Sequence, residues 1–250
     1  MKTRVGEVPD GVQEARRDRV DAPSVRVLSA ERIPILDIGD PLPDAERANV
    51  DGLVAVGGGF SVPRLREAYS KGLFPWSAHP ITWWSPDPRA VFELDKGVHV
   101  SRRLGQKIRQ QRYEITRDVA FAEVIEGCAS ARRPDGGTWI SPPIVEAYIR
   151  LHNAGHAHSV EAWDEQGRLV GGVYGVATGG CFSGESMFRR DTDASKVALY
   201  HLAEHLKARG FLLFDAQVLN PFTERMGAVE ISRAEFLARL RAALEIQAKF

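Results

Sequence analysis

The stretch Phe211-Leu-Leu-Phe-Asp-Ala-Gln-Val-Leu-Asn220 decides much of how this chain folds and where its chemistry lies. Its apolar run is typical of a buried strand, and side chains two apart on a strand share a face, so Asp215 and Gln217 are predicted to lie together. Upstream, Cys181-Phe-Ser-Gly-Glu-Ser-Met-Phe188 is a second apolar strand with one carboxylate, Glu185. Because a polar group in an apolar strand costs free energy unless it is paired or used, the two strands indicate a site.

Around these strands the sequence predicts a mixed α/β arrangement. Glycines separate three strands at about 157–163, 168–177 and 180–187. A helix over 194–209 follows, with apolar residues on one face and a glycine at its end, and the strand 211–218 comes next. This order of elements, with strands followed by a helix and a further strand, is that of one half of an N-acetyltransferase-like fold. Order alone does not fix function.

The residues before 89 predict a smaller unit. Residues 1–30 are polar and charged, and we expect a flexible tail there. Residues 52–59 form a predicted strand with a glycine turn, and Ser61 is the predicted N-cap of a helix that ends at Gly72. The proline-rich stretch 73–88 is predicted to be irregular, because prolines limit both helices and strand ladders. We therefore expect a tail 1–30, a small N-terminal domain 31–88 and a C-terminal domain 89–250.

The bulk composition shows no strong bias. The 250 residues carry 33 basic and 33 acidic side chains, so a nucleic-acid role would need a local basic patch. The two cysteines, Cys128 and Cys181, lack zinc-site spacing and suit a reduced protein of the cytoplasm. No apolar run approaches the roughly 18 residues of a membrane helix, and the N-terminus lacks the apolar core of a secretory signal. We expect a cytoplasmic monomer that does not enter a membrane.

The best local candidate for a basic patch is a predicted helix over 101–112. It contains five basic residues and no acidic one, around an apolar stripe of Leu104 and Ile108. It can be an ordinary solvated face or a surface that binds nucleic-acid phosphates, and the residues leave both interpretations open. The basic residues are Arg102, Arg103, Lys107, Arg109 and Arg112.

Three other kinds of site are disfavoured by the residues. The turn 57–59 lacks the Gly-Lys-Ser/Thr ending of a phosphate loop and the helix start of a dinucleotide fingerprint. Residues 189–196 have no glycine and carry Asp191 and Asp193, which would repel the pyrophosphate of coenzyme A. His156 and His158 would share a strand face, but no third metal ligand lies nearby in the sequence, so we expect no metal and no cofactor.

Several motifs together resemble those of the bacterial leucyl/phenylalanyl-tRNA–protein transferases, over about residues 33–240. The most specific are Trp83-Trp-Ser-Pro-Asp-Pro-Arg89 and Gly184-Glu-Ser-Met-Phe188, and the others are Gly72-Leu-Phe-Pro-Trp76, Val124-Ile-Glu-Gly-Cys-Ala-Ser130, Gly137-Thr-Trp-Ile140 and Asp215-Ala-Gln-Val-Leu-Asn220. The resemblance implies an α+β fold, in which a small N-terminal α/β domain packs on an N-acetyltransferase-like (GNAT-like) C-terminal domain with a mixed sheet and flanking helices.

The same resemblance implies the reaction. Such enzymes move Leu or Phe, and less readily Met, from aminoacyl-tRNA to proteins with an N-terminal Arg or Lys, which marks those proteins for N-degron degradation. A tRNA ester as the acyl donor would also account for the missing coenzyme A turn. An acetyltransferase-like enzyme that uses coenzyme A and a tRNA-binding protein without chemistry remain the alternatives.

The resemblance also assigns residues. It makes Asp215 and Gln217 the catalytic pair and places Glu185 in the wall of the site. Helix 101–112 matches the basic tRNA surface. We hypothesise that Gln217 orients the acceptor amine, that Asp215 fixes the Gln217 amide, and that Glu185 and Asp215 bind the cationic acceptor side chain. The other substrate-binding positions are Trp76, Trp139, Val173, Phe182, Met187, Leu199 and Asn220.

Overall fold

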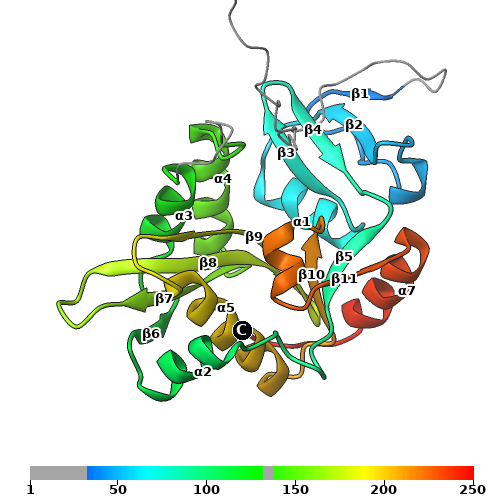
Figure 1. Cartoon of the computed structure of the whole chain (residues 1–250). Helices are drawn as coiled ribbons and strands as arrows, with labels where there is room; N and C mark the ends of the chain where they lie inside the picture. Colours follow the sequence, from blue (N-terminus) through cyan, green and yellow to red (C-terminus); the bar gives the residue numbers. More distant parts are fainter. Residues whose placement is uncertain (1–32, 132–137) are drawn as a thin grey trace, which may run out of the picture.

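The computed structural model describes residues 33–131 and 138–250, which form two sheets with helices packed around them (Figure 1). The predicted tail 1–30 lies outside the described residues. The first sheet has the strand order β1-β2-β4-β3. Its strands are β1 (Ile35–Leu36), β2 (Leu53–Gly57), β3 (Phe74–Ala78) and β4 (Ile81–Trp84), and the sheet is accompanied by a 3-10 helix, η1 (Ala45–Arg47), and by α1 (Val62–Ser70). Ser61 accepts a hydrogen bond from the backbone N–H of Arg64, which confirms it as the N-cap of α1.

The stretch 73–88 is not irregular, so that prediction is wrong. Strands β3 and β4 pair as an antiparallel hairpin, with a register shift between Pro75 and Ser77. Strand β3 is the edge strand of its sheet, and an edge is where a proline without an N–H is tolerated. The sequence argument excluded proline from every ladder and overlooked this case.

The second sheet is mixed and has seven strands in the order β11-β5-β10-β9-β8-β7-β6. Strand β10 runs parallel to β9 and antiparallel to β5, and the pairs β7–β8 and β8–β9 form the predicted meander. The predicted strands of the meander and the strand after the long helix are confirmed. The bounds are β5 (Arg89–Phe92), β6 (Glu114–Arg117), β7 (Ala157–Trp163), β8 (Leu169–Thr178), β9 (Cys181–Arg189), β10 (Leu213–Gln217) and β11 (Val229–Ile231).

Helices lie on both faces of this sheet (Figure 1). The helices α3 (Phe121–Ala129) and α4 (Pro142–Asn153) pack with the N-terminal sheet and α1 in one apolar core, and α2 (Arg102–Arg109) and α5 (Ala194–Ala208) pack in a second. The remaining helices are α6 (Pro221–Arg225) and α7 (Arg233–Leu244). Helix α2 is shorter than predicted, so Arg112 lies beyond its end. The mixed α+β class is confirmed, whereas the GNAT-like layout and the division at residue 88 stay predictions.

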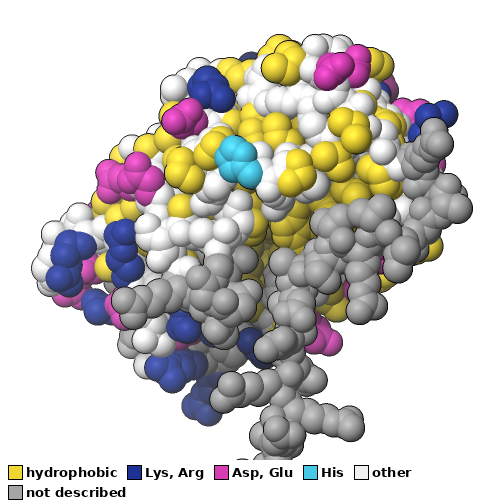
Figure 2. All heavy atoms as spheres, turned by 90° about the horizontal axis from the view of Figure 1, so that it is seen from above, with side chains coloured by type: hydrophobic (Ala, Val, Ile, Leu, Met, Phe, Trp, Pro, Cys, Tyr) yellow, Lys and Arg dark blue, Asp and Glu magenta, His cyan; other side chains and the backbone are white. Residues whose placement is uncertain are grey.

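None of the helices in the described part of the chain is both long and apolar enough to cross a membrane. On the face seen from above in Figure 2, hydrophobic side chains gather in the middle and charged side chains lie toward the rim. Among the described residues, the large hydrophobic side chains with the greatest exposure are those of Ile35, Ile38 and Val50, in or beside the N-terminal sheet.

Candidate active site

The end of β10 carries a bulge that sets the geometry of the site. Its pairing with β5 shifts between Asp215 and Gln217, and Gln217 adopts a φ of 64°, which is uncommon for a residue other than glycine. The bulge breaks the two-residue alternation of the strand. Gln217 and Ala216 therefore line a cavity, whereas Asp215 is fully buried and does not line it. The prediction that Asp215 and Gln217 share a face is wrong for this reason.

Asp215 is held by a buried arginine that the sequence analysis missed. Arg89 Nε and Nη2 donate to the two carboxylate oxygens of Asp215, at 2.8 and 2.7 Å. Ser183 Oγ donates to Asp215 Oδ2 at 3.0 Å, and the backbone N–H of Gln217 donates to Oδ1 at 2.9 Å. A lone arginine at the head of the apolar run Arg89-Ala-Val-Phe92 was the sequence signal for this pair.

The Gln217 side chain is fixed by Glu185 of β9. Gln217 Nε2 donates to Glu185 Oε1 at 2.7 Å. Glu185 also lies within hydrogen-bond distance of the hydroxyls of Tyr69 of α1, at 2.7 Å, and of Tyr148 of α4, at 3.2 Å, and the two hydroxyls are within hydrogen-bond distance of each other. The Gln217 amide is thus oriented by its nitrogen, and within residues 33–131 and 138–250 its carbonyl oxygen Oε1 has no hydrogen-bond partner.

Burial changes the ionisation of this network. The pKa of Glu185 is raised to about 8, mainly by desolvation and also by the nearby negative charge of Asp215, and hydrogen bonds with Tyr69, Tyr148 and Gln217 offset part of the rise. Burial also raises the pKa of both Tyr69 and Tyr148 well above 10. The neutral form of Glu185 is consequently favoured relative to an ordinary glutamate, and both tyrosines keep their hydroxyl protons at neutral pH.

The cavity beside Gln217 has a volume of about 310 Å³. This lies at the low end for ligand cavities and suits one amino-acid side chain. Its walls are mainly apolar and aromatic. Most of the predicted substrate-binding residues line it, namely Trp76, Trp139, Val173, Glu185, Met187, Leu199 and Asn220. The sequence analysis missed Phe74, Phe92, Phe214 and Phe222, which line it as well.

Two of the predicted substrate-binding residues have a different place or an additional role. Phe182 is fully buried and does not line the cavity, because its side chain lies behind Phe214, with ring centroids 5.8 Å apart. Phe182 is therefore not part of the wall, and its role in shaping the pocket for the amino-acid side chain stays a prediction. Asn220 lines the cavity, but its side chain accepts hydrogen bonds from the backbone N–H groups of Phe222 and Thr223 and caps α6.

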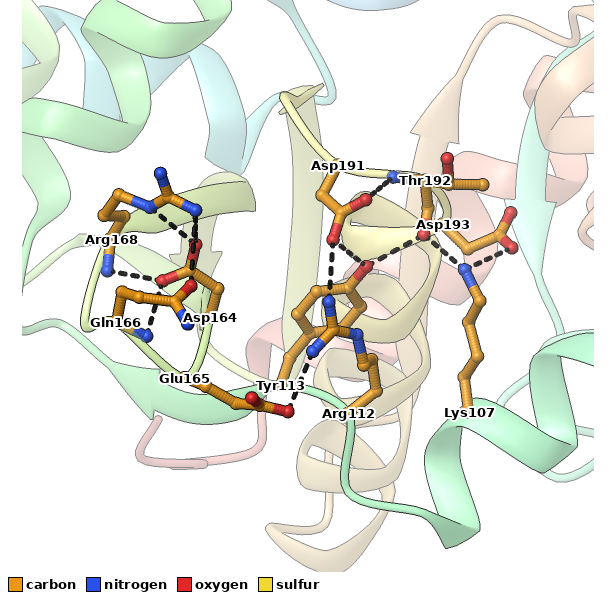
Figure 3. Close-up of polar contacts among 10 residues, drawn as sticks. All are labelled: Lys107, Arg112, Tyr113, Asp164, Glu165, Gln166, Arg168, Asp191, Thr192 and Asp193. Carbon is orange, nitrogen blue, oxygen red and sulfur yellow. Dashed lines mark hydrogen bonds and ion pairs between the residues drawn. The ribbon is translucent and has the colours of Figure 1, made fainter.

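The predicted basic surface is partly neutralised by the chain itself, as Figure 3 shows. Lys107 Nζ lies 3.1 Å from Asp193 Oδ2 and donates to the carbonyl oxygen of Thr192 at 2.6 Å. Arg112 pairs with Glu165 at 3.0 Å and lies 3.8 Å from Asp191.

The other three basic side chains of this surface face solvent. Arg103 makes only a long pair with Asp193, at 3.9 Å. Arg102 and Arg109 are exposed and form no ion pair with any described residue. The turn 191–193, which was predicted to repel a pyrophosphate, thus binds basic groups of the same chain.

The histidines do not form a metal site in the described part of the chain. His158 Nδ1 lies 2.7 Å from Asp118 Oδ2, so this side chain is engaged with a carboxylate. Residues 33–131 and 138–250 contain no group of three or more His, Cys, Asp or Glu side chains that could hold a metal ion.

The fold and the site together define an α+β protein in which a buried polar network opens onto a pocket for an apolar group. The model of the leucyl/phenylalanyl-tRNA protein transferase family matches residues 91–241, and that of its N-terminal domain matches residues 58–87. The chain therefore belongs to this family of aminoacyltransferases, as its motifs predicted.

Individual relatives support the same assignment. A leucyl/phenylalanyl-tRNA–protein transferase of Alkalilimnicola ehrlichii is 50% identical over 208 residues, which cover 82% of this chain and 80% of the relative. One of Aromatoleum aromaticum is 51% identical over 212 residues, or 83% and 89% of the two chains. Among solved structures, L-PGS from Bacillus licheniformis is similar with a TM-score of 0.41 and 13% identity over 72% of this chain and 70% of that one, which is too distant to carry an argument.

Proposed function

We propose that this chain transfers Leu or Phe, and less readily Met, from aminoacyl-tRNA to the N-terminal Arg or Lys of acceptor proteins, and so marks them for N-degron degradation. The observation that carries the proposal is the Gln217–Glu185 pair in the wall of an apolar cavity. The cavity suits an apolar aminoacyl side chain, and the free amide oxygen of Gln217 suits an incoming amine. Membership of the family supports the choice of donor and reaction.

In the proposed reaction the acceptor α-amine attacks the carbonyl carbon of the aminoacyl ester. A C–N bond forms, the C–O bond to the tRNA ribose breaks, and the amine proton passes to the leaving ribose oxygen, directly or through water. The ester is already activated, so the step needs no ATP. An α-amine has a pKa of about 7.7–8.0, so roughly a tenth or more is unprotonated at neutral pH. The catalyst therefore has to position the amine rather than act as a strong base.

Each polar residue then has a distinct role. Gln217 Oε1 accepts an N–H of the acceptor amine, and Glu185 turns the amide so that this oxygen faces the cavity. Asp215 is a positioning residue rather than a catalytic one, because both of its oxygens are occupied by Arg89, Ser183 and the Gln217 backbone. The hypothesis that Asp215 fixes the Gln217 side-chain amide is thereby corrected, because Glu185 holds that amide.

The hypothesis that Glu185 and Asp215 bind the acceptor's cationic side chain does not agree with these contacts. Asp215 already pairs with Arg89, and the pKa of Glu185 is raised to about 8 by burial. Among the described residues that line the cavity, Glu185 is the only acidic one. Recognition of Arg or Lys would then use groups outside this cavity, and the preference for these two residues rests on the family alone.

We place the tRNA across the exposed side of α2, and its 3′ adenosine near Trp76 and Trp139, since aromatic faces stack on bases. We further propose that the protein acts as a monomer in the cytoplasm and that its domains divide near residue 88. The division is supported by the change of sheet between Trp84 and Arg89 and by the two family models, which meet between residues 87 and 91.

A transfer assay tests the proposal. Labelled Leu-, Phe- and Met-tRNA are each incubated with a peptide that begins with Arg, with its N-acetylated form and with a peptide that begins with Ala. We expect label on the free Arg peptide only. A parallel incubation uses labelled acetyl-coenzyme A as the donor, and label transferred from it instead would support the acetyltransferase alternative. Binding of tRNA without transfer would support a binding protein.

A further inference from the structure

Phe182 belongs to a chain of aromatic rings that runs to Phe250 from the cavity beside Gln217, which we call the donor cavity because it is proposed to hold the aminoacyl side chain of the donor. Phe214 lines the cavity, and its ring centroid lies 5.0 Å from that of Phe92, another wall residue. Phe182 contacts Phe214 edge-on from behind, at 5.8 Å. Phe250 then stacks on Phe182, with centroids 5.5 Å apart and an interplanar angle of 23°. The wall of the cavity is thus backed by two further layers of rings.

Phe250 is held firmly in this position. Its ring stacks on His158 at 4.4 Å with an interplanar angle of 18°, and it meets His205 of α5 edge-on at 4.7 Å. The carbonyl oxygen of the preceding residue, Lys249, accepts a hydrogen bond from Arg209 Nε at 2.6 Å. The ring is therefore fixed from three directions, and it fixes Phe182 in turn.

We propose that Phe250 is a positioning residue that sets the size of the donor cavity and so helps decide which aminoacyl group is used. Protein interiors are close-packed, so the loss of a supporting ring lets its neighbours relax toward the empty space. Phe182 and then Phe214 would move away from the cavity, which becomes deeper. The inference rests on the proposed function, since it concerns the aminoacyl group of the donor.

The size of the effect follows from how apolar pockets discriminate. One methylene more or less in such a pocket is worth 10–200-fold in selectivity. A small retreat of Phe214 is less than the change of one methylene, so the preference for Phe over Leu should shift by about 3–10-fold, which is below that range. The shift should favour Phe, because the larger side chain gains most from a deeper cavity.

The test compares Phe250→Ala and Phe250→Leu with Ile246→Ala as a matched control. Ile246 lies in the same segment and is 37% exposed, and its side chain packs near Gly180. The readouts are the Phe-to-Leu ratio of kcat/KM for the full chain, and the ratio of the two Kd values for phenylalanyl- and leucyl-adenosine linked by a stable 3′-amide. The second readout requires no transfer, so failure of the proposed function and failure of this inference can be told apart.

We expect both ratios to shift toward Phe by about 3–10-fold in Phe250→Ala, less in Phe250→Leu, and not at all in Ile246→Ala. If Phe250→Ala does not fold, Phe250→Leu carries the test, with a shift in the same direction. Ratios within twofold of the unaltered chain in the folded Phe250 variants would overturn the inference. An equal shift in Ile246→Ala would also overturn it, because loosening of the segment alone would then be sufficient.

Discussion

The guanidinium of Arg89 and the carboxylate of Asp215 form a two-point ion pair in which the side chains are 1% and 0% exposed. Arg89 also donates to the carbonyl oxygen of Gly72 at 3.2 Å and lies over the rings of Phe74 and Phe236. The pair thus joins the N-terminal sheet and α7 to the bulge that carries Gln217. Removing one partner from a buried pair leaves an uncompensated charge, which costs more than the pair contributes.

Asp215→Ala should therefore lower both stability and activity. We expect the free energy of unfolding to fall by about 3–5 kcal/mol, since the Arg89 charge is left buried and unpaired. Transfer should fall strongly while tRNA binding stays nearly intact, because Asp215 does not contact phosphates. Urea unfolding, transfer and filter binding measure the three effects. The double variant Arg89→Met with Asp215→Leu should lose less stability than the sum of the losses of its two single variants. Additive losses would contradict the buried ion pair, and near-normal turnover of Asp215→Ala would contradict the role of Asp215 in transfer.

Changes at Gln217 should separate chemistry from backbone strain. Gln217→Ala and Gln217→Gly both remove the amide that orients the amine, so both should lose most of their transfer activity. The positive φ of this residue is easier for glycine, so Gln217→Gly should be more stable than Gln217→Ala by about 1 kcal/mol. Thermal or urea unfolding measures this difference. Normal transfer by either folded variant would show that the amide is dispensable.

The raised pKa of Glu185 predicts a pH dependence of stability. Its pKa is about 8 in the folded chain, against 4.5 for an ordinary glutamate. Between these values the folded state binds more protons than the unfolded state, so the free energy of unfolding should fall as pH rises from about 5 to 8. Urea unfolding at several pH values measures this slope. Glu185→Gln, which is neutral throughout, should show a flatter profile, and identical profiles for the two proteins would rule out this contribution.

The contacts of α2 refine the tRNA prediction. Arg102 and Arg109 face solvent, whereas Lys107 neutralises Asp193. Replacing Arg102 and Arg109 by Ala should make tRNA binding less sensitive to salt. In a plot of the logarithm of the binding constant against the logarithm of the salt concentration, the slope should become less steep by up to about 0.9 for each duplex phosphate contact that is lost. Lys107→Ala, the matched control, should change the slope less and reduce stability. Leu and Phe donors should respond alike, since backbone contacts carry no sequence information. An unchanged slope in the double variant would leave α2 as an ordinary solvated face.

The donor cavity predicts graded selectivity. Leu, Phe and Met esters should all react, Val and Ala esters poorly because they leave the cavity underfilled, and Asp and Lys esters not at all, because their charge would be buried without a partner. Val173 is almost fully buried and lines the cavity, so Val173→Phe should shrink it and penalise Phe more than Leu. Competition between Leu- and Phe-tRNA measures this change. Equal losses for both donors would show that Val173 does not shape the cavity.

The sequence by itself determined the family of this protein and most elements of the second sheet, but not the hairpin of β3 and β4. The glycine-punctuated meander, the long helix and the strand 211–218 could be read from local patterns, because alternation and turn residues act over a few positions. The motifs around Trp83 and Glu185 identified the family, and the resemblance selected seven substrate-binding positions that the structure then places in the wall of the cavity, namely Trp76, Trp139, Val173, Glu185, Met187, Leu199 and Asn220. Each of these inferences needs only neighbouring residues or a matching motif.

The tertiary structure alone decided which groups meet. Arg89 and Asp215 are 126 residues apart, and their pairing follows from the adjacency of β5 and β10 in the sheet. The bulge that turns Gln217 toward Glu185, the neutralisation of Lys107 by Asp193 and the burial of Phe182 behind Phe214 likewise depend on contacts between distant elements. Local sequence carries no record of such contacts. They are set by how the sheets and helices pack, and this packing buries Asp215 outside the cavity, with both of its carboxylate oxygens hydrogen-bonded.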